Sequence, residues 1–262
     1  MLKDWRTQLV IIFFSGFILL FIVAPIAGLL FRTSPAEYST AIQDSEVTSS
    51  IGLTLLAAMG ATIIFGVLSV PLAYILARKS FPLKGLINGI IDVPVVIPHS
   101  AAGIALLGII SRGTWVGQAG EAAGISFVGG IAGIVVAMAF VSLPFAINAA
   151  RDGFAAVPEK LEKAALNLGA SPHRVFFSIS LPLAKRSVIS GLVMMWARGL
   201  SEFGAVIIIA YHPMITPILI WERFTSFGLS YARPAAAIFI LVCLAIFITM
   251  RVLSGNKYHV RN

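Results

Sequence analysis

Long apolar stretches alternate with short polar ones along the whole chain. A helix needs about 20 predominantly apolar residues to cross the roughly 30 Å of hydrocarbon in a bilayer. Six stretches reach or approach this length, and most charged residues fall between them. They predict transmembrane helices near residues 8–31, 48–77, 94–110, 129–149, 187–211 and 234–253. The pattern therefore predicts an all-α, polytopic protein with six transmembrane helices in a lipid bilayer.

Composition supports this class and excludes a soluble globular domain. Of the 262 residues, 58% are hydrophobic and only 11% are charged, whereas about 25% are charged in typical soluble domains. The first apolar stretch is longer than the core of a signal peptide and lacks a clear small-x-small cleavage site, so we expect it to remain as the first helix. We predict a single transmembrane domain over residues 1–262, with a polar loop at residues 151–186.

Basic residues determine the predicted topology. The net charge is +8, and basic residues concentrate at the two ends, in the second loop and in the fourth loop, as is typical of cytoplasmic segments. We therefore place both termini and the loop at residues 151–186 in the cytoplasm and expect no nucleic acid as a partner. The basic residues on this side are Lys3, Arg6, Arg78, Lys79, Lys84, Arg151, Lys160, Lys163, Arg174, Lys185, Arg186, Arg251, Lys257 and Arg261. Those on the opposite side are Arg32, Arg112, Arg223 and Arg233, each near acidic residues.

Residue patterns typical of catalysis or metal binding do not occur in the sequence. There is no G-x-x-x-x-G-K-[ST] phosphate loop and no G-x-S-x-G nucleophile motif. The four histidines lack metal-ligand spacing, and Cys243 is the only cysteine. We therefore predict no catalytic residue, no metal site and no cofactor in this chain, so that any chemical energy source belongs to another subunit.

The loop at residues 151–186 carries signals for two short helices. Val157-Pro158-Glu159 favours a helix start, because Pro fits the first turn and acidic side chains complement the positive helix end. Gly169 predicts the end of this helix. Ser171 and Pro172 predict a second short helix reaching about Phe177, with Ser171 as its cap.

The first predicted helix has a shallow apolar face. Leu161, Ala164, Ala165 and Leu168 share this face by the three-and-four rule. Such a surface suits insertion into the groove of a partner protein. An amphipathic helix lying on lipid headgroups explains the same pattern equally well.

Motif spacing favours the partner protein. Ala164-Ala165 is followed after three residues by Gly169, and later by Ile179, Leu181 and Pro182. This spacing resembles the EAA motif of ABC importer permeases, the loop on which the ATP-binding subunit docks. Lys163 stands at the Glu position of the motif, directly after Glu162, and Glu162 is the candidate substitute for that contact. The resemblance implies these coupling residues: Glu162, Lys163, Ala164, Ala165, Leu168, Gly169, Ser171 and Pro172.

Two further segments narrow the family. Residues 197–205, ARGLSEFGA, are similar to the A-R-x-x-x-E-F-G-A sequence of permeases that import molybdate, tungstate and sulfate. Residues 92–103, DVPVVIPHSAAG, resemble the molybdate/tungstate-type branch, although that branch more often has Pro-Pro where this chain has Pro98-His99. The resemblance implies a type I permease fold and import of a tetrahedral oxyanion, molybdate or tungstate, across the cytoplasmic membrane of a prokaryote.

The resemblance also implies partners. These are a second copy of the chain, two cytoplasmic ATP-binding subunits that hold ATP and Mg²⁺, and an extracytoplasmic oxyanion-binding protein. Each chain has one coupling loop, and each of the two ATP-binding subunits needs one loop to dock on. This agrees with a twofold dimer of the chain. The alternatives are a sulfate/thiosulfate permease and an ion-coupled secondary transporter. The latter needs ionisable residues at mid-membrane.

Charged and helix-breaking residues inside the spans are the candidates for the pathway. Arg198 and Glu202 are four residues apart and are expected to pair on one helix face, as a structural ion pair or with Arg198 contacting the anion. Pro94 and Pro98 break the start of the third span and leave amide donors free. His99 and Ser100 at this point are gate candidates; the alternative for His99 is a hydrogen-bonded polar residue at a helix end. We expect weak selectivity in the pathway, with discrimination in the binding protein.

Overall fold

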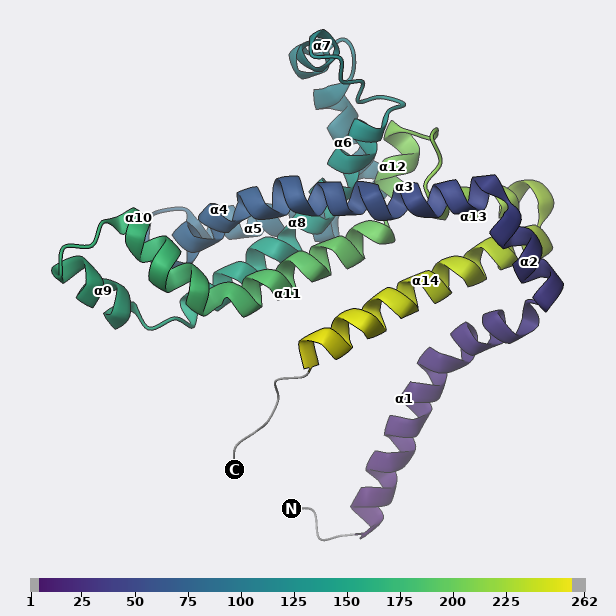
Figure 1. The fold of residues 1–262 in the computed structure, drawn as a ribbon, viewed down its shortest axis with the longest axis horizontal. Coiled ribbons are helices and arrows are strands. Elements are labelled where there is room, and N and C mark those ends of the chain that lie inside the picture. Colours follow the sequence, from purple (N-terminus) through teal and green to yellow (C-terminus); the bar gives the residue numbers. More distant parts are fainter. Residues whose placement is uncertain (1–4, 256–262) are drawn as a thin grey trace. The chain divides into compact units, whose positions relative to one another are not determined.

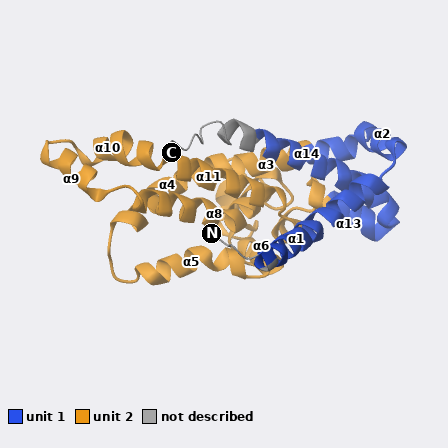
Figure 2. Cartoon of the chain, turned by 90° about the horizontal axis from the view of Figure 1, so that it is seen from below, with its two compact units in different colours: residues 1–51, 219–262 blue, residues 52–218 orange. Residues whose placement is uncertain are grey.

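The computed structural model describes residues 5–255, so Lys3, Lys257 and Arg261 of the predicted cytoplasmic charge lie outside it. Helices make up nearly all of the described range, which contains no strand, and the all-α prediction is confirmed (Figure 1). The chain divides into two compact units, residues 1–51 with 219–262 and residues 52–218 (Figure 2). That residues 1–262 form one domain stays a prediction.

The first unit contains α1 (Trp5–Arg32), α2 (Pro35–Gln43) and α14 (Leu229–Gly255). Helix α2, which was not predicted, begins with a capping box in which Ser34 and Glu37 satisfy each other's backbone N–H groups. Arg233 of α14 pairs with Glu37. Arg223 pairs with Asp44 at 2.7 Å and with Glu46 at 3.1 Å. These ion pairs hold the ends of its helices together.

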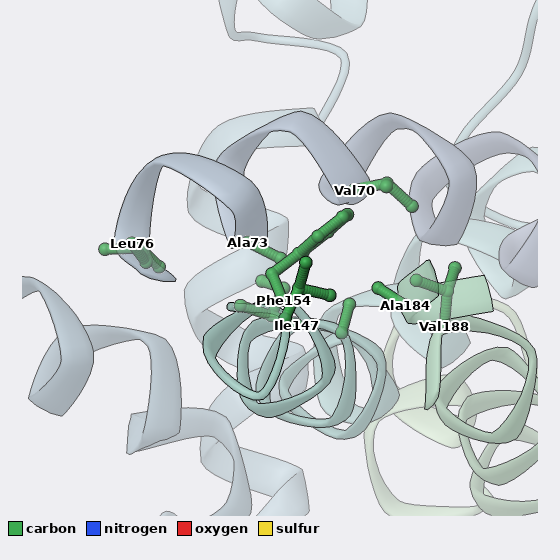
Figure 3. Packing of buried hydrophobic residues seen from close by; sticks show 9 residues of the cluster. Val70, Ala73, Leu76, Ile147, Phe154, Ala184 and Val188 are labelled. Carbon is green, nitrogen blue, oxygen red and sulfur yellow. The ribbon is translucent and has the colours of Figure 1, made fainter. Parts of the chain in front are cut away.

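The second unit is built around α8 (Ile131–Ala155), which packs against α4 (Val67–Arg78) and α11 (Leu181–Leu200). Glycines permit the close approach of α8 and α11: a Cβ on Gly191 would lie 2.8 Å from that of Ala149. Figure 3 shows the apolar cluster between these helices. Its labelled members are Val70, Ala73, Leu76, Ile147, Phe154, Ala184 and Val188.

The second predicted span is one long helix. Helix α3 (Ser45–Ala61) continues through a π-helical turn, η1 (Thr62–Gly66), into α4. The predicted spans at residues 8–31, 129–149 and 234–253 correspond to α1, α8 and α14, each longer than predicted. Within the described range, five helices meet the length and hydropathy of a membrane span, and a bent pair brings the number to six.

That bent pair shows that the third predicted span was drawn wrongly. Helix α5 (Lys84–Val96) and α6 (His99–Ile110) meet at 115°. Pro98 pushes Ile97 into an extended conformation (φ −71°, ψ 149°) and ends α5. Helix α5 also begins at Lys84, in a segment predicted as loop because of its charge.

The fifth predicted span, residues 187–211, was also wrong as a continuous helix. Helix α11 ends at Leu200, and the short α12 (Gly204–Ile209) follows after a break. The carboxylate of Glu202 accepts the N–H of Ala205 at 2.9 Å and so replaces a helical hydrogen bond at the break. Helices α7 (Trp115–Ala122) and α13 (Thr216–Phe227) were not predicted.

Candidate functional site

The first short helix of the loop between α8 and α11 begins at the residue that the sequence predicted. Helix α9 (Glu159–Asn167) follows Pro158, and Gly169 lies beyond its end with φ +84°. This left-handed conformation suits glycine and lets the N–H of Ala170 bond to the carbonyl of Ala165 at 3.0 Å. The predicted start and end of the helix are confirmed.

The second short helix of the loop was predicted wrongly in its extent. Ser171 caps it as expected, by accepting the N–H of Arg174 at 3.3 Å. However, α10 (Pro172–Val175) runs through a π-helical turn, η2 (Phe176–Ser180), directly into α11. The wider turn accommodates Pro182, which has no N–H for a regular helical bond. Residues 172–200 therefore form one continuous rod that starts in the loop.

The apolar face of α9 is uncovered in this chain. Leu168 is 89% exposed and Leu161 is 42% exposed. Beside them lies a shallow pocket of about 340 Å³. We call the exposed leucines and this pocket together the coupling face. The residues that line the pocket are Ala165, Leu168, Gly169, Ala170, Arg174, Val175, Ser178 and Ile179. Figure 1 shows α9 and α10 at one end of the second unit.

Two adjacent charged residues of α9 have opposite orientations. Lys163 is exposed and pairs with Glu159 at 2.8 Å, which lowers the pKa of Glu159. Glu162 is only 7% exposed and is enclosed by Arg78, Ser180 and Tyr74. Burial acts to raise the pKa of Glu162, but hydrogen bonds from Arg78 and Ser180 outweigh it, and the pKa is lowered.

Arg78, at the end of α4, was not predicted as a functional candidate, and neither were Tyr74 and Ser180, which also contact Glu162. Arg78 was counted only as a marker of topology at the end of the second span. Its partner is 84 residues away along the chain, so local spacing carried no signal for the contact. A basic residue that ends an apolar helix without a nearby acidic residue was the available hint.

The two helix breaks bring together three of the predicted pathway residues. His99 Nδ1 lies 2.9 Å and Arg198 Nη2 lies 3.3 Å from Oε2 of Glu202. Arg198 Nη2 also lies 2.8 Å from Nε2 of His99. We call these residues the break cluster. Glu202 is fully buried, whereas the side chains of His99 and Arg198 are 34% and 23% exposed.

Glycine permits this junction of α6 with α12. A Cβ on Gly204 would lie 2.7 Å from that of His99, and one on Gly103 would lie 2.9 Å from the carbonyl oxygen of Ala205. Pro98 and Ser100, at the start of α6, are exposed and are not members of the break cluster. In residues 5–255 no three His, Cys, Asp or Glu side chains are grouped as metal ligands.

Comparison with known proteins gives consistent results. Residues 69–256 match the family of binding-protein-dependent transport system inner membrane components. The molybdate/tungstate transport system permease protein of Thermococcus kodakarensis is 44% identical over 92% of this chain and 93% of its own length. A probable sulfate transport system permease protein of Chlorokybus atmophyticus is 29% identical over 92% of this chain and 86% of its own.

A solved structure gives the fold. A chain of a bacterial ABC transporter involved in the import of alginate has a TM-score of 0.75 at 17% identity, covering 98% of this chain and 97% of that one. This likeness confirms the predicted type I permease fold, and the identities above confirm the resemblance to molybdate/tungstate-type permeases. The chain belongs to the family of inner membrane components of binding-protein-dependent transport systems, as a multi-pass permease subunit of an ABC transporter.

Proposed function

We propose that this chain is the membrane-spanning subunit of an ATP-driven importer of molybdate or tungstate. The observation that carries the proposal is the coupling face, an uncovered apolar surface on a short helix held at the end of two long spans. Exposed apolar surface on a rigid helix favours a protein partner with a complementary groove. The 44% identity to a molybdate/tungstate permease protein favours this oxyanion class over sulfate, whose permease relative is 29% identical.

The proposed complex contains two copies of this chain and two cytoplasmic ATP-binding subunits. ATP and Mg²⁺ belong to the latter, and an extracytoplasmic binding protein delivers the oxyanion. The coupling face and both termini then lie in the cytoplasm of a prokaryotic cell, as the distribution of basic residues favours. Movement of the ATP-binding subunit displaces α9, and the rod of residues 172–200 carries the displacement into the membrane.

The bend at the start of α6, at His99 and Ser100 beside the break cluster, is our candidate for the gate of the pathway. Two bent elements meet there, and bent helices are suited to rearrangement because their backbone bonds are already interrupted. Pro98 and Ser100 flank the cluster on the exposed side. The partners of Arg198 are Glu202, His99 and Ser201, so little positive potential is left for an anion, and we assign Arg198 a structural role.

Arg198→Gln tests this assignment. We expect less assembled complex but uptake per assembled complex within about threefold of wild type, because a positioning ion pair acts through assembly. Uptake is measured with radiolabelled tungstate in vesicles and divided by the amount of purified complex. An intact complex with coupled ATP hydrolysis but no uptake assigns Arg198 to anion contact instead.

The function itself is tested by reconstitution. The chain is co-expressed with an ATP-binding subunit and a binding protein from its genomic neighbourhood, and the complex is placed in liposomes. We expect tungstate uptake that requires ATP and the loaded binding protein, and weak competition by sulfate. Uptake by the chain alone under an ion gradient overturns the proposal in favour of a secondary transporter, and preference for sulfate replaces the substrate class.

A matched pair of variants tests the coupling face. Leu168→Asp places a charge on its most exposed leucine, and Leu83→Asp places one on an exposed leucine of the polar segment before α5. We expect Leu168→Asp to lower co-purification of the ATP-binding subunit about tenfold or more, since burying an unpaired charge costs several kcal/mol. Equal loss in both variants contradicts docking at this face.

A further inference from the structure

Glu162 lies beside the coupling face but does not belong to it. Its neighbours on α9, Leu161 and Lys163, are exposed, while Glu162 points into the protein. The carboxylate that was the candidate for contact with an ATP-binding subunit is therefore engaged within this chain.

The contacts of Glu162 use both oxygens. Arg78 Nε donates to Oε1 and Oε2, each at 3.0 Å, and Arg78 Nη2 donates to Oε1 at 2.8 Å. The hydroxyl of Ser180 donates to Oε1 at 2.7 Å, and that of Tyr74 approaches Oε2 at 3.4 Å. Arg78 Nη2 also donates to the carbonyl of Val157 at 2.9 Å. We call this group the clamp.

The clamp joins three structural elements. Tyr74 and Arg78 are in the last turns of α4, and Val157 and Glu162 lie just before and within α9. Ser180 is the last residue of η2, directly before α11. The Arg78 and Glu162 side chains are only 8% and 9% exposed. The ring of Tyr74 packs edge-on against Phe154 and Phe176, with centroids 5.3 and 5.0 Å away.

An Arg–Glu pair joined by several hydrogen bonds fixes the relative orientation of the two side chains as well as the distance between them. The planar guanidinium of Arg matches a carboxylate at two points, which a Lys ammonium does not do. Buried ion pairs add little net stability compared with apolar residues, because desolvation offsets their attraction. The value of this one therefore lies in the geometry that it imposes on α4, α9 and α11.

We propose that Glu162 and Arg78 are positioning residues that make α9, the end of α4 and the start of α11 move as one body. Force applied at the coupling face then reaches α11 without loss in the loop, and α11 carries it to Arg198 in its last turn. The inference rests on the proposed function, since it needs a partner that pushes on α9.

Two variants and one control test the clamp in the reconstituted complex. Glu162→Gln removes the charge and keeps the shape; Arg78→Lys keeps the charge and removes the fork. Glu159→Gln removes an exposed carboxylate from the same helix as the control. The readouts are the amount of complex, basal ATP hydrolysis, and tungstate taken up per ATP hydrolysed.

Both clamp variants are expected to keep basal ATP hydrolysis within about twofold of wild type, because the ATP sites belong to the partner subunit. They are expected to lose about tenfold in uptake per ATP, because each weakens the hydrogen-bonded pair that joins α4, α9 and α11. Glu159→Gln is expected to match wild type. A merely stabilising role lowers the amount of complex and leaves uptake per ATP unchanged in what remains, and that result overturns the proposal. Wild-type complex without ATP-driven uptake overturns the proposed function instead.

If the Glu162→Gln chain does not assemble into a complex, a covalent cross-link in place of the Arg78–Glu162 pair still tests the proposal. Arg78→Cys and Glu162→Cys are combined with Cys243→Ser, in cysteine-free partners, and bridged by a short bis-methanethiosulfonate reagent. The bridge is expected to restore uptake per ATP, and a reducing agent is expected to abolish it again. Bridged complex that assembles and hydrolyses ATP without regaining uptake overturns the proposal.

Discussion

The clamp and the break cluster are both built from a buried glutamate and an arginine, yet their surroundings differ. The side chain of Arg78 is as buried as that of Glu162, and both carboxylate oxygens of Glu162 accept hydrogen bonds. Arg198 and His99 are partly exposed, while Glu202 beneath them is fully buried. One pair is sealed and the other is open on one side. The buried pair of the clamp is suited to a fixed connection between helices, and the partly exposed break cluster is suited to a contact that rearranges.

The largest expected effect comes from removing each arginine. Arg78→Ala leaves the Glu162 carboxylate buried without its cation, which costs about 3–5 kcal/mol. Arg198→Ala is expected to cost less, because His99 remains beside Glu202 and the Arg198 side chain is itself partly exposed. Thermal unfolding of the purified chain in detergent measures both.

The exposed pair of Arg112 and Glu121, 73% and 46% exposed, provides the control. Arg112→Ala is expected to change stability by less than about 1 kcal/mol. If Arg198→Ala destabilises the chain as much as Arg78→Ala does, the distinction between a sealed and an open pair is lost.

A smaller effect is expected from crowding the junction of α6 and α12. The Cβ of Gly204→Ala would meet that of His99 at 2.7 Å, so the break cluster must shift, at a cost of about 1–3 kcal/mol. Gly108→Ala, within α6 but with nothing within 4 Å of the new Cβ, is the matched control and is expected not to crowd any neighbour. Thermal unfolding and tungstate uptake measure both variants. Equal stability and uptake in the two contradicts a tightly packed junction.

Chemical labelling probes the open side of the break cluster with little change in stability. Cysteines at His99 and Ser100 are expected to react with an aqueous maleimide in at least one nucleotide state, because both positions are accessible in this chain. Ala102→Cys, fully buried, is expected to stay unlabelled. Resistance at positions 99 and 100 in every nucleotide state rules out a gate there.

The sequence predicted those parts of the coupling loop that depend on local chemistry. Pro158, Gly169 and Ser171 set helix ends through backbone geometry and caps, and these signals lie within a few residues of their effect. The inward direction of Glu162 depends on Arg78, 84 residues away, and no local pattern contains it. Tertiary contacts decide such orientations.

The bends in the spans were harder to predict than the spans themselves. Hydropathy records how apolar a segment is and not its direction, so residues 187–211 were predicted as one straight helix and the first part of α5 was predicted as loop. Pro94 and Pro98 were both predicted to break the third span. Pro98 does so, at an angle of 115° that the sequence did not indicate, whereas Pro94 lies inside α5. At α11 the break depends on the side chain of Glu202 replacing a backbone bond, which composition does not show.

The smallest expected effect is a pH dependence that belongs to the clamp. The pKa of Glu162 is lowered from its ordinary value of 4.5: burial acts to raise it, and the bonds from Arg78 and Ser180 prevail. A group with a lowered folded pKa stabilises the protein above its unfolded pKa and loses that contribution as pH falls through the folded value. The advantage of wild type over Glu162→Gln is therefore expected to be constant above about pH 5 and to shrink below 4.5.

Comparing the two proteins at each pH cancels the titration of other carboxylates, such as Glu37 and Asp44, whose pKa values are also lowered. Thermal unfolding in detergent from neutral pH downward gives the difference. A difference that grows on acidification means that protonated Glu162 is the stabilising form, which is incompatible with a clamp that depends on the carboxylate charge facing Arg78.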